Sequence, residues 1–100
     1  PQYEYPHTLA RYAECGRFCG VTGKDDAEVF KKFLVKITEL KTAVGVKPTI
    51  QAYGVDEKYF LDTLDAMVEQ AFDDQCTGAN PRYPLMSELK EMYLKAYYGK

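Results

Sequence analysis

Apolar side chains recur at helical spacing between residues 25 and 44, and this periodicity constrains the fold more than any other feature of the chain. Asp25, followed three residues later by Glu28, resembles a capping box, which satisfies free amides at a helix N-terminus. Gly45 can end the helix, and Pro48 prevents its continuation. The apolar stripe comprises Val29, Phe30, Phe33, Ile37, Leu40 and Val44. The segment predicts an amphipathic helix with one buried face.

Three further segments share this spacing, and none shows the alternation typical of a strand. Helices are predicted over residues 8–20, from Asp56 to about Phe72, and from about Leu85 to Gly99. Thr8 and Asp56 can cap two of them, whereas Gly16 weakens the first. Thr49 can cap a short helical turn at residues 50–53. The prediction is an all-α fold, a small bundle of about four helices plus one short helical turn.

Length, charge and cysteine content narrow the class of protein. One domain is expected from 100 residues, and a net charge of −2 argues against a nucleic-acid partner. No apolar run reaches the ~18 residues of a membrane span, so no membrane association is expected. The three cysteines are an odd number, which favours free thiols in a reducing compartment such as the cytoplasm. Residues 1–7 read as an extended lead-in, and a chain opening on Pro1 is expected to be a processed product or an excised piece.

Motifs for self-contained catalysis are absent from the sequence. It has no glycine-rich phosphate loop, and its one histidine, His7, is expected at the surface or in packing. Cys15 and Cys19, four residues apart, are interpreted as small half-buried thiols, because a metal site would need two more ligands. Cys76 has no histidine in the same region to act as a base. We therefore expect no catalytic, cofactor-binding or metal-binding residues.

The connection "AFDDQCTGANPRYP", residues 71–84, is more elaborate than joining two helices requires. Asp73 and Asp74 are either a solvated acid pair or groups that hold the connection, by hydrogen bonds or by pairing with Arg82. Asn80 precedes Pro81, so its backbone is pushed away from α geometry while its side chain can bind nearby amides. Arg82 brings five hydrogen-bond donors. The composition indicates a connection built to hold one shape.

Three stretches resemble a known family. "AFDDQCTGANPRYPLMSELKEMYLKAYYG" looks like the C-terminal end of the iron-dependent (group III) alcohol dehydrogenases, in the form found in bifunctional aldehyde-alcohol dehydrogenases. "PQYEYPHTLARYAE" resembles the segment after the last metal-binding histidine of that family, and "GVKPTIQAYGVDEKYFL" resembles a later connection. The resemblance implies that residues 1–100 are the C-terminal helical subdomain of the alcohol dehydrogenase half, without its nucleotide domain and metal ligands.

What the resemblance implies for function concerns the parent enzyme. The parent would reduce acetyl-CoA to acetaldehyde and then to ethanol with NADH, using iron held by one aspartate and three histidines upstream of Pro1. It would be cytoplasmic, roughly 870 residues long at the several-domain scale, and a homo-oligomer or filament (a spirosome). The partners of this chain would be the rest of the parent and a small aldehyde or alcohol. The chain alone, lacking iron and NAD, is expected to be inactive.

The same resemblance gives site residues. Cys76 matches a cysteine that lies beside the metal and lines the substrate pocket, with simple packing as the other interpretation. Asn80, Pro81 and Arg82 are expected to brace that connection from behind, with Asp73 and Asp74. The alternative function is a free-standing helical protein-interaction module. An exposed apolar patch would favour a subdomain taken from a larger enzyme over that alternative.

Overall fold

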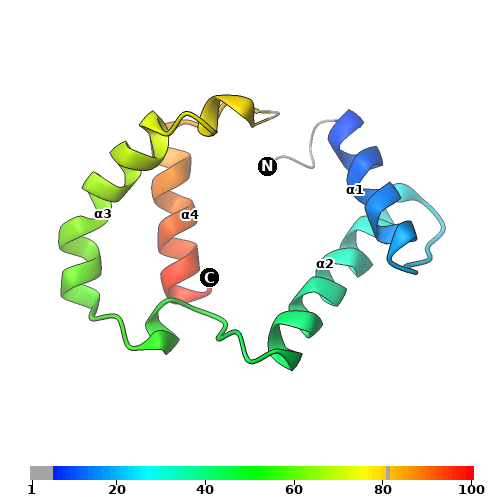
Figure 1. Cartoon of the computed structure of the whole chain (residues 1–100), viewed down its shortest axis with the longest axis horizontal. Helices are drawn as coiled ribbons and strands as arrows, with labels where there is room; N and C mark the ends of the chain where they lie inside the picture. Colours follow the sequence, from blue (N-terminus) through cyan, green and yellow to red (C-terminus); the bar gives the residue numbers. More distant parts are fainter. Residues whose placement is uncertain (1–5, 81) are drawn as a thin grey trace. The chain divides into compact units, whose positions relative to one another are not determined.

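The computed structural model describes residues 6–80 and 82–100, with side chains from residue 8 onward. Its helices are α1 (Pro6–Phe18), α2 (Asp26–Ala43), α3 (Glu57–Asp73) and α4 (Met86–Tyr98), with short 3₁₀ turns η2 (Gln51–Tyr53) and η3 (Thr77–Ala79) (Figure 1). The described residues contain no strand, so the predicted all-α fold is confirmed. The chain divides into two compact units, Pro1–Val46 and Lys47–Lys100.

The predicted helix ends follow from local capping. The carboxylates of Asp25 and Asp56 accept hydrogen bonds from the amides of Glu28 and Tyr59, both at 2.9 Å. Gly45 takes a positive φ of 81° after α2, a backbone conformation that residues other than glycine rarely adopt. The Thr49 hydroxyl accepts from the Ala52 amide at 3.0 Å, as predicted for the short turn.

The start of α1 differs from the prediction. The helix begins at Pro6 rather than after Thr8, so the expected extended lead-in is wrong for Pro6 and His7. Proline suits the first turn of a helix because its missing N–H is not needed there and its φ is already helical. The remainder of the lead-in, residues 1–5, lies outside the described residues, as does the side chain of His7.

The first unit is a pair of helices around a small core. Ala13 of α1, Val21 of the following turn and Val29 of α2 are buried, with Phe33 packed against them. Tyr12 and Phe30 make a tilted ring contact with centroids 5.6 Å apart. The Arg17 guanidinium lies 2.6 Å from the Asp26 carboxylate, linking the end of α1 to the start of α2.

Burial along α2 covers only part of the predicted stripe. Val29 and Phe30 are buried and Phe33 is partly buried, as expected. Leu40 and Val44 are 62% and 68% exposed, and Ile37 is exposed as well. The C-terminal half of the stripe is exposed, contrary to the prediction, because α1 is only 13 residues long and covers only the N-terminal part of the 18-residue α2.

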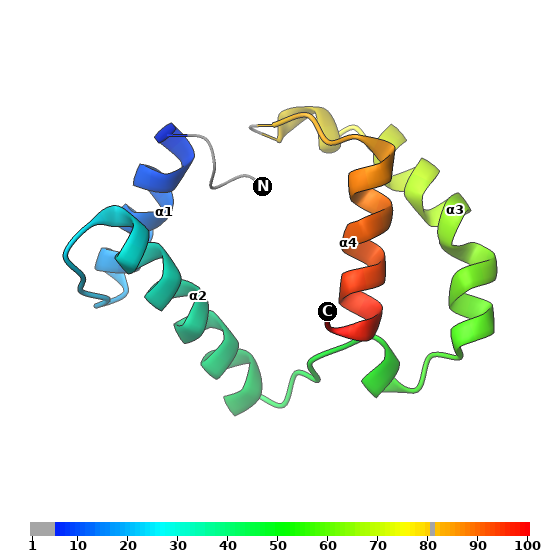
Figure 2. The ribbon, with the colours of Figure 1, turned by 180° about the vertical axis from the view of Figure 1, so that it is seen from behind.

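The second unit packs α3 against α4, which run antiparallel and side by side in both ribbon views (Figures 1 and 2). Its core is formed by Phe60, Leu64, Val68 and Tyr97. The Phe60 and Tyr97 rings stack with centroids 4.3 Å apart. The Ile50 amide donates to the Ala96 carbonyl at 3.0 Å, which fastens the segment before η2 to α4.

Helical spacing predicts inner-face positions for four residues of these helices that are instead exposed: Tyr59, Leu85, Met92 and Ala96. Among the helices of the described ranges, none has both the length and the apolar content that a membrane crossing needs.

Candidate functional site

The connection between α3 and α4, residues 74–85, holds the predicted site residues other than Asp73. Its first half is fastened to α3. The Asp74 carboxylate accepts from the Cys76 amide at 2.7 Å. The Thr77 amide donates to the Asp74 carbonyl at 3.0 Å, and the Thr77 hydroxyl donates to the carbonyl of Ala71. Cys76 therefore stands at the start of η3, in a turn held by hydrogen bonds on both sides.

The second half of the connection is fastened to α4. The Asn80 side-chain amide donates to the Arg82 carbonyl, and the Arg82 guanidinium pairs with the Glu88 carboxylate. The other Glu88 oxygen accepts from the Leu85 amide at 2.8 Å. Glu88 thus satisfies a free amide at the N-terminus of α4 and binds a cation of the connection at the same time.

An aromatic contact joins the two ends of this connection. Tyr83 meets Phe72 of α3 edge to face, with ring centroids 5.7 Å apart. Such pairs are worth about 0.5–1.5 kcal/mol beyond the area they bury. Because Phe72 precedes the connection and Tyr83 lies near its end, the contact helps to close the segment on itself.

Electrostatics at Glu88 favour its charged form. Its hydrogen bond from Arg82, followed by the one from the Leu85 amide, lowers the pKa of Glu88 below its ordinary value of 4.5. The Arg82 and Glu88 side chains are each 29% exposed, which sets them apart from the more exposed ion pairs of the described residues. Partial burial shields this pair from solvent screening more than a fully exposed pair.

The predicted site residues are placed as follows. The Cys76 thiol is free and exposed. Asp74 braces the turn through its carboxylate, whereas Asp73 is exposed at the last position of α3. Asn80 and Arg82 are partly buried and bonded within the connection. Pro81 lies outside the described residues.

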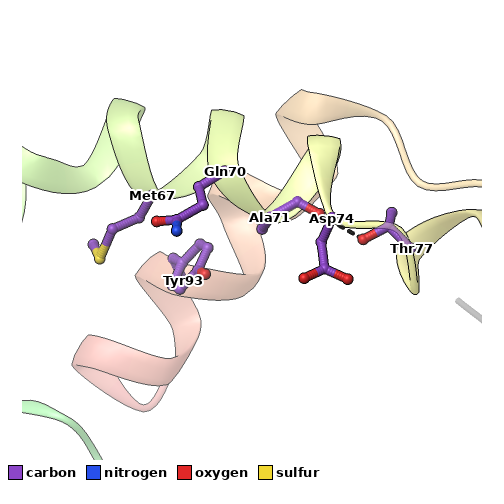
Figure 3. A pocket seen from close by; sticks show the side chains of 6 residues that line it. All are labelled: Met67, Gln70, Ala71, Asp74, Thr77 and Tyr93. Carbon is purple, nitrogen blue, oxygen red and sulfur yellow. Dashed lines mark hydrogen bonds between the residues drawn. The ribbon is translucent and has the colours of Figure 1, made fainter.

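A pocket of about 500 Å³ adjoins the first half of the connection (Figure 3). Tyr93 contributes one wall from α4, and the remaining lining residues come from α3 and the turn after it. The lining is Met67, Gln70, Ala71, Asp74, Thr77 and Tyr93. Asp74 belongs to both features, since its carboxylate lines the pocket and holds the Cys76 amide. Cys76 itself is not among the lining residues of this pocket.

Within residues 8–80 and 82–100, no group of three or more His, Cys, Asp or Glu side chains is placed to hold an ion.

Sequence reasoning missed two residues that shape the connection. Glu88 lies three positions after Leu85, the spacing of a capping glutamate, so a signal for it was present. Tyr83 carried no signal, because its partner Phe72 is fixed only by the path of the connection.

Comparison with known sequences identifies the chain. The sequence model of the Fe-containing alcohol dehydrogenase family, C-terminal region, matches residues 2–97. The chain belongs to the iron-containing alcohol dehydrogenase family. The resemblance inferred from the 71–99 stretch is therefore confirmed, and the all-helical fold agrees with it.

Individual members of the iron-containing alcohol dehydrogenase family extend this match. The aldehyde-alcohol dehydrogenase of Clostridium acetobutylicum is 46% identical over 97 residues, covering 97% of this chain. The bifunctional aldehyde-alcohol dehydrogenase AdhE of Escherichia coli K12 is 46% identical over 101 residues, covering 99%. The NADPH-dependent butanol dehydrogenase of Clostridium saccharobutylicum is 30% identical over 92 residues. The chain spans only 11% of the length of the first two relatives and 24% of the third.

Proposed function

We propose that residues 1–100 form the C-terminal helical subdomain of the alcohol dehydrogenase half of a bifunctional aldehyde-alcohol dehydrogenase. The carrying observation is the 46% identity to two such enzymes over nearly the whole chain. The parent reduces acetyl-CoA to acetaldehyde and acetaldehyde to ethanol. Iron and NAD belong to the parent, and this chain supplies neither.

The coenzyme is the finer part of the proposal. One relative is named as NADPH-dependent, but it is 30% identical, against 46% for the bifunctional relatives. We infer NADH as the coenzyme because the residue pattern resembles the bifunctional enzymes more closely. An assay with both coenzymes separates the two cases.

The test uses the full-length protein that contains this chain, purified with iron. We expect NADH oxidation with acetyl-CoA and with acetaldehyde, and loss of the second reaction when iron is removed with a chelator. Residues 1–100 expressed alone should give no NADH-dependent reduction of acetaldehyde. Activity of the isolated chain, or a full-length protein inert toward both substrates, contradicts the proposal.

The exposed face of α2 supports a subdomain rather than a free-standing module. Three exposed apolar side chains share one face of α2 and its C-cap residue: Ile37, Leu40 and Val44. An exposed apolar face of this kind marks a contact surface in soluble proteins. The two bifunctional relatives are about nine times as long as this chain, so the rest of such a parent is the natural cover for the face.

For the connection, we propose that Cys76 forms part of the wall of the substrate pocket for a small aldehyde or alcohol in the parent. Support comes from its free, exposed thiol and from the turn that fixes its backbone. The connection is braced by Asp74, Asn80, Pro81 and Arg82. The bracing role has the least support for Asp73, because that side chain is exposed at the end of α3. A bulky residue at position 76 should change KM and substrate range.

The remaining proposals concern the setting of the parent. Three free thiols suit a cytoplasmic enzyme. The likeness to bifunctional enzymes supports a homo-oligomer or a spirosome filament, which size-exclusion chromatography and electron microscopy of the full-length protein would test.

A further inference from the structure

Hydrogen bonds from the second half of the connection converge on one side chain of α4, Glu88. One carboxylate oxygen binds the Arg82 guanidinium and the other binds the Leu85 amide. The Arg82 carbonyl in turn accepts from the Asn80 side chain. Glu88 is therefore a point at which Arg82 and Leu85 are attached to α4.

We propose that Glu88 is a positioning residue for the substrate pocket: it fixes the α4 end of the connection that presents Cys76. The inference rests on the proposed function, in which Cys76 lines the aldehyde pocket. Glu88 touches no reacting group and acts through Arg82 and the backbone.

The connection needs two anchors to hold one shape. At the α3 end, the Asp74 carboxylate and the Thr77 hydroxyl hold the turn around Cys76. At the α4 end, the ion pair between Arg82 and Glu88 serves as the second anchor. The ring of Tyr83, packed on Phe72, adds a contact between the two ends of the connection. Removing Glu88 takes a carboxylate partner from the partly buried Arg82 guanidinium and the acceptor from the Leu85 amide, which loosens that end of the connection.

A positioning role predicts a specific kinetic signature. A loosened pocket wall weakens capture of the aldehyde, whereas hydride transfer depends on groups outside this chain. In the full-length enzyme, Glu88→Ala should raise KM for acetaldehyde by ~5–10-fold while kcat stays within about twofold, the sign of lost binding shared by ground state and transition state. Glu88→Gln keeps an acceptor for the Leu85 amide but loses the charge. Its KM should therefore fall between those of the unmodified enzyme and Glu88→Ala.

The pair with Arg82 supplies an internal check. Arg82→Ala should raise KM in the same direction as Glu88→Ala. Because the two side chains act as one unit, the double variant should be no worse than the more severe single variant. Fully additive effects would show that Glu88 does not act through Arg82 and would overturn the proposal.

The chain offers a matched control. Lys90 and Asp65 form an ion pair at 2.6 Å that also joins α4 to α3 but does not touch the connection. Asp65→Ala should leave KM unchanged. If it raises KM as much as Glu88→Ala does, general packing of the two helices is the cause and the positioning role is wrong.

Failure of this inference is distinguishable from failure of the proposed function. If Cys76→Phe alters aldehyde KM but neither Glu88 variant does, only the positioning role is overturned. If Cys76→Phe leaves KM and substrate range unchanged, the pocket assignment itself falls. Thermal unfolding of each variant is measured alongside, and where Glu88→Ala does not fold, Glu88→Gln and Arg82→Ala decide the question by the same KM criterion.

Discussion

At the residue scale, Tyr97 shows how a single side chain can close a small core. Tyr97 is 1% exposed, and its ring stacks on Phe60. Its hydroxyl donates a hydrogen bond to the Val55 carbonyl at 2.7 Å. Burial, followed by the nearby Glu57 and Asp56 carboxylates, raises the pKa of Tyr97. Helical spacing predicted Tyr97 for the inner face of the last helix, and its burial confirms that prediction. Its hydroxyl finds a backbone partner inside the unit.

Two substitutions at Tyr97 separate its ring from its hydroxyl. Tyr97→Phe keeps the stacking and loses one hydrogen bond, so it should cost about 0.5–1.5 kcal/mol of unfolding free energy. Tyr97→Ala also leaves a cavity and should cost about 3–5 kcal/mol. Urea unfolding of the chain, followed by circular dichroism, measures both. Tyr59→Phe, at an exposed position, is the control and should change stability by less than about 0.5 kcal/mol. Equal costs at Tyr97 and Tyr59 would contradict the assigned core.

Glu88 gives a residue-scale prediction of pH dependence. Its pKa is lowered in the folded chain, so the unfolded chain binds the proton more tightly. The stabilisation is therefore fully present above the ordinary value of 4.5 and is lost as pH falls through the lowered pKa. Urea midpoints measured between pH 7 and pH 3 should fall less steeply for Glu88→Gln than for the unmodified chain. Identical slopes would show that the Arg82 pair does not form in solution.

At the element scale, the contact between α1 and α2 depends on the absence of a side chain at Gly16. A Cβ atom added there would lie 3.0 Å from a methyl group of Val29 and 3.2 Å from the Cβ atom of Phe33. The sequence alone showed only a helix-weakening glycine, but the structure shows that it allows the two helices to approach closely.

Gly16→Leu should therefore push the two helices apart. Overpacking typically costs about 1–3 kcal/mol, which more than offsets the gain of about 1 kcal/mol in helix propensity. Circular dichroism during thermal unfolding should show a lower Tm. Ala10→Leu adds a leucine at an exposed position of the same helix and should leave Tm nearly unchanged. A Tm that is unchanged or higher for Gly16→Leu would mean that α1 and α2 do not pack as described.

Which parts of the structure were predictable depends on the range of the forces involved. The helix ends followed from local signals, as with Asp25, Asp56 and Gly45, because capping involves residues next to one another in sequence. Depth of burial did not follow: Leu40 and Tyr59 share helical spacing with core residues but lie beyond the reach of a partner helix. In the site, Asp74 and Arg82 form hydrogen bonds within or next to the connection, and their bracing role for a substrate pocket stays a prediction. Tyr83 was not, because its contact depends on the path of the whole connection.

At the scale of the whole molecule, the exposed stripe of α2 separates a subdomain from an independent module. In the isolated chain, this stripe should bind a hydrophobic dye such as ANS. Leu40→Gln should reduce the dye fluorescence, whereas Glu39→Gln, which places the same side chain on another face of α2, should not. In the full-length enzyme the dye should no longer reach the stripe, so equal dye binding by both proteins would speak against burial by the parent.

The central claim is that this chain belongs to an alcohol-forming dehydrogenase and contributes Cys76 to its substrate pocket. The most direct test is the steady-state kinetics of NADH-dependent reduction, by the full-length enzyme, of aldehydes of increasing length. The claim predicts that KM rises more steeply with aldehyde length in the Cys76→Phe variant than in the unmodified enzyme. The control is Cys19→Phe, at an exposed cysteine of the other unit, which should leave the dependence of KM on aldehyde length unchanged. An unchanged series for Cys76→Phe would contradict it.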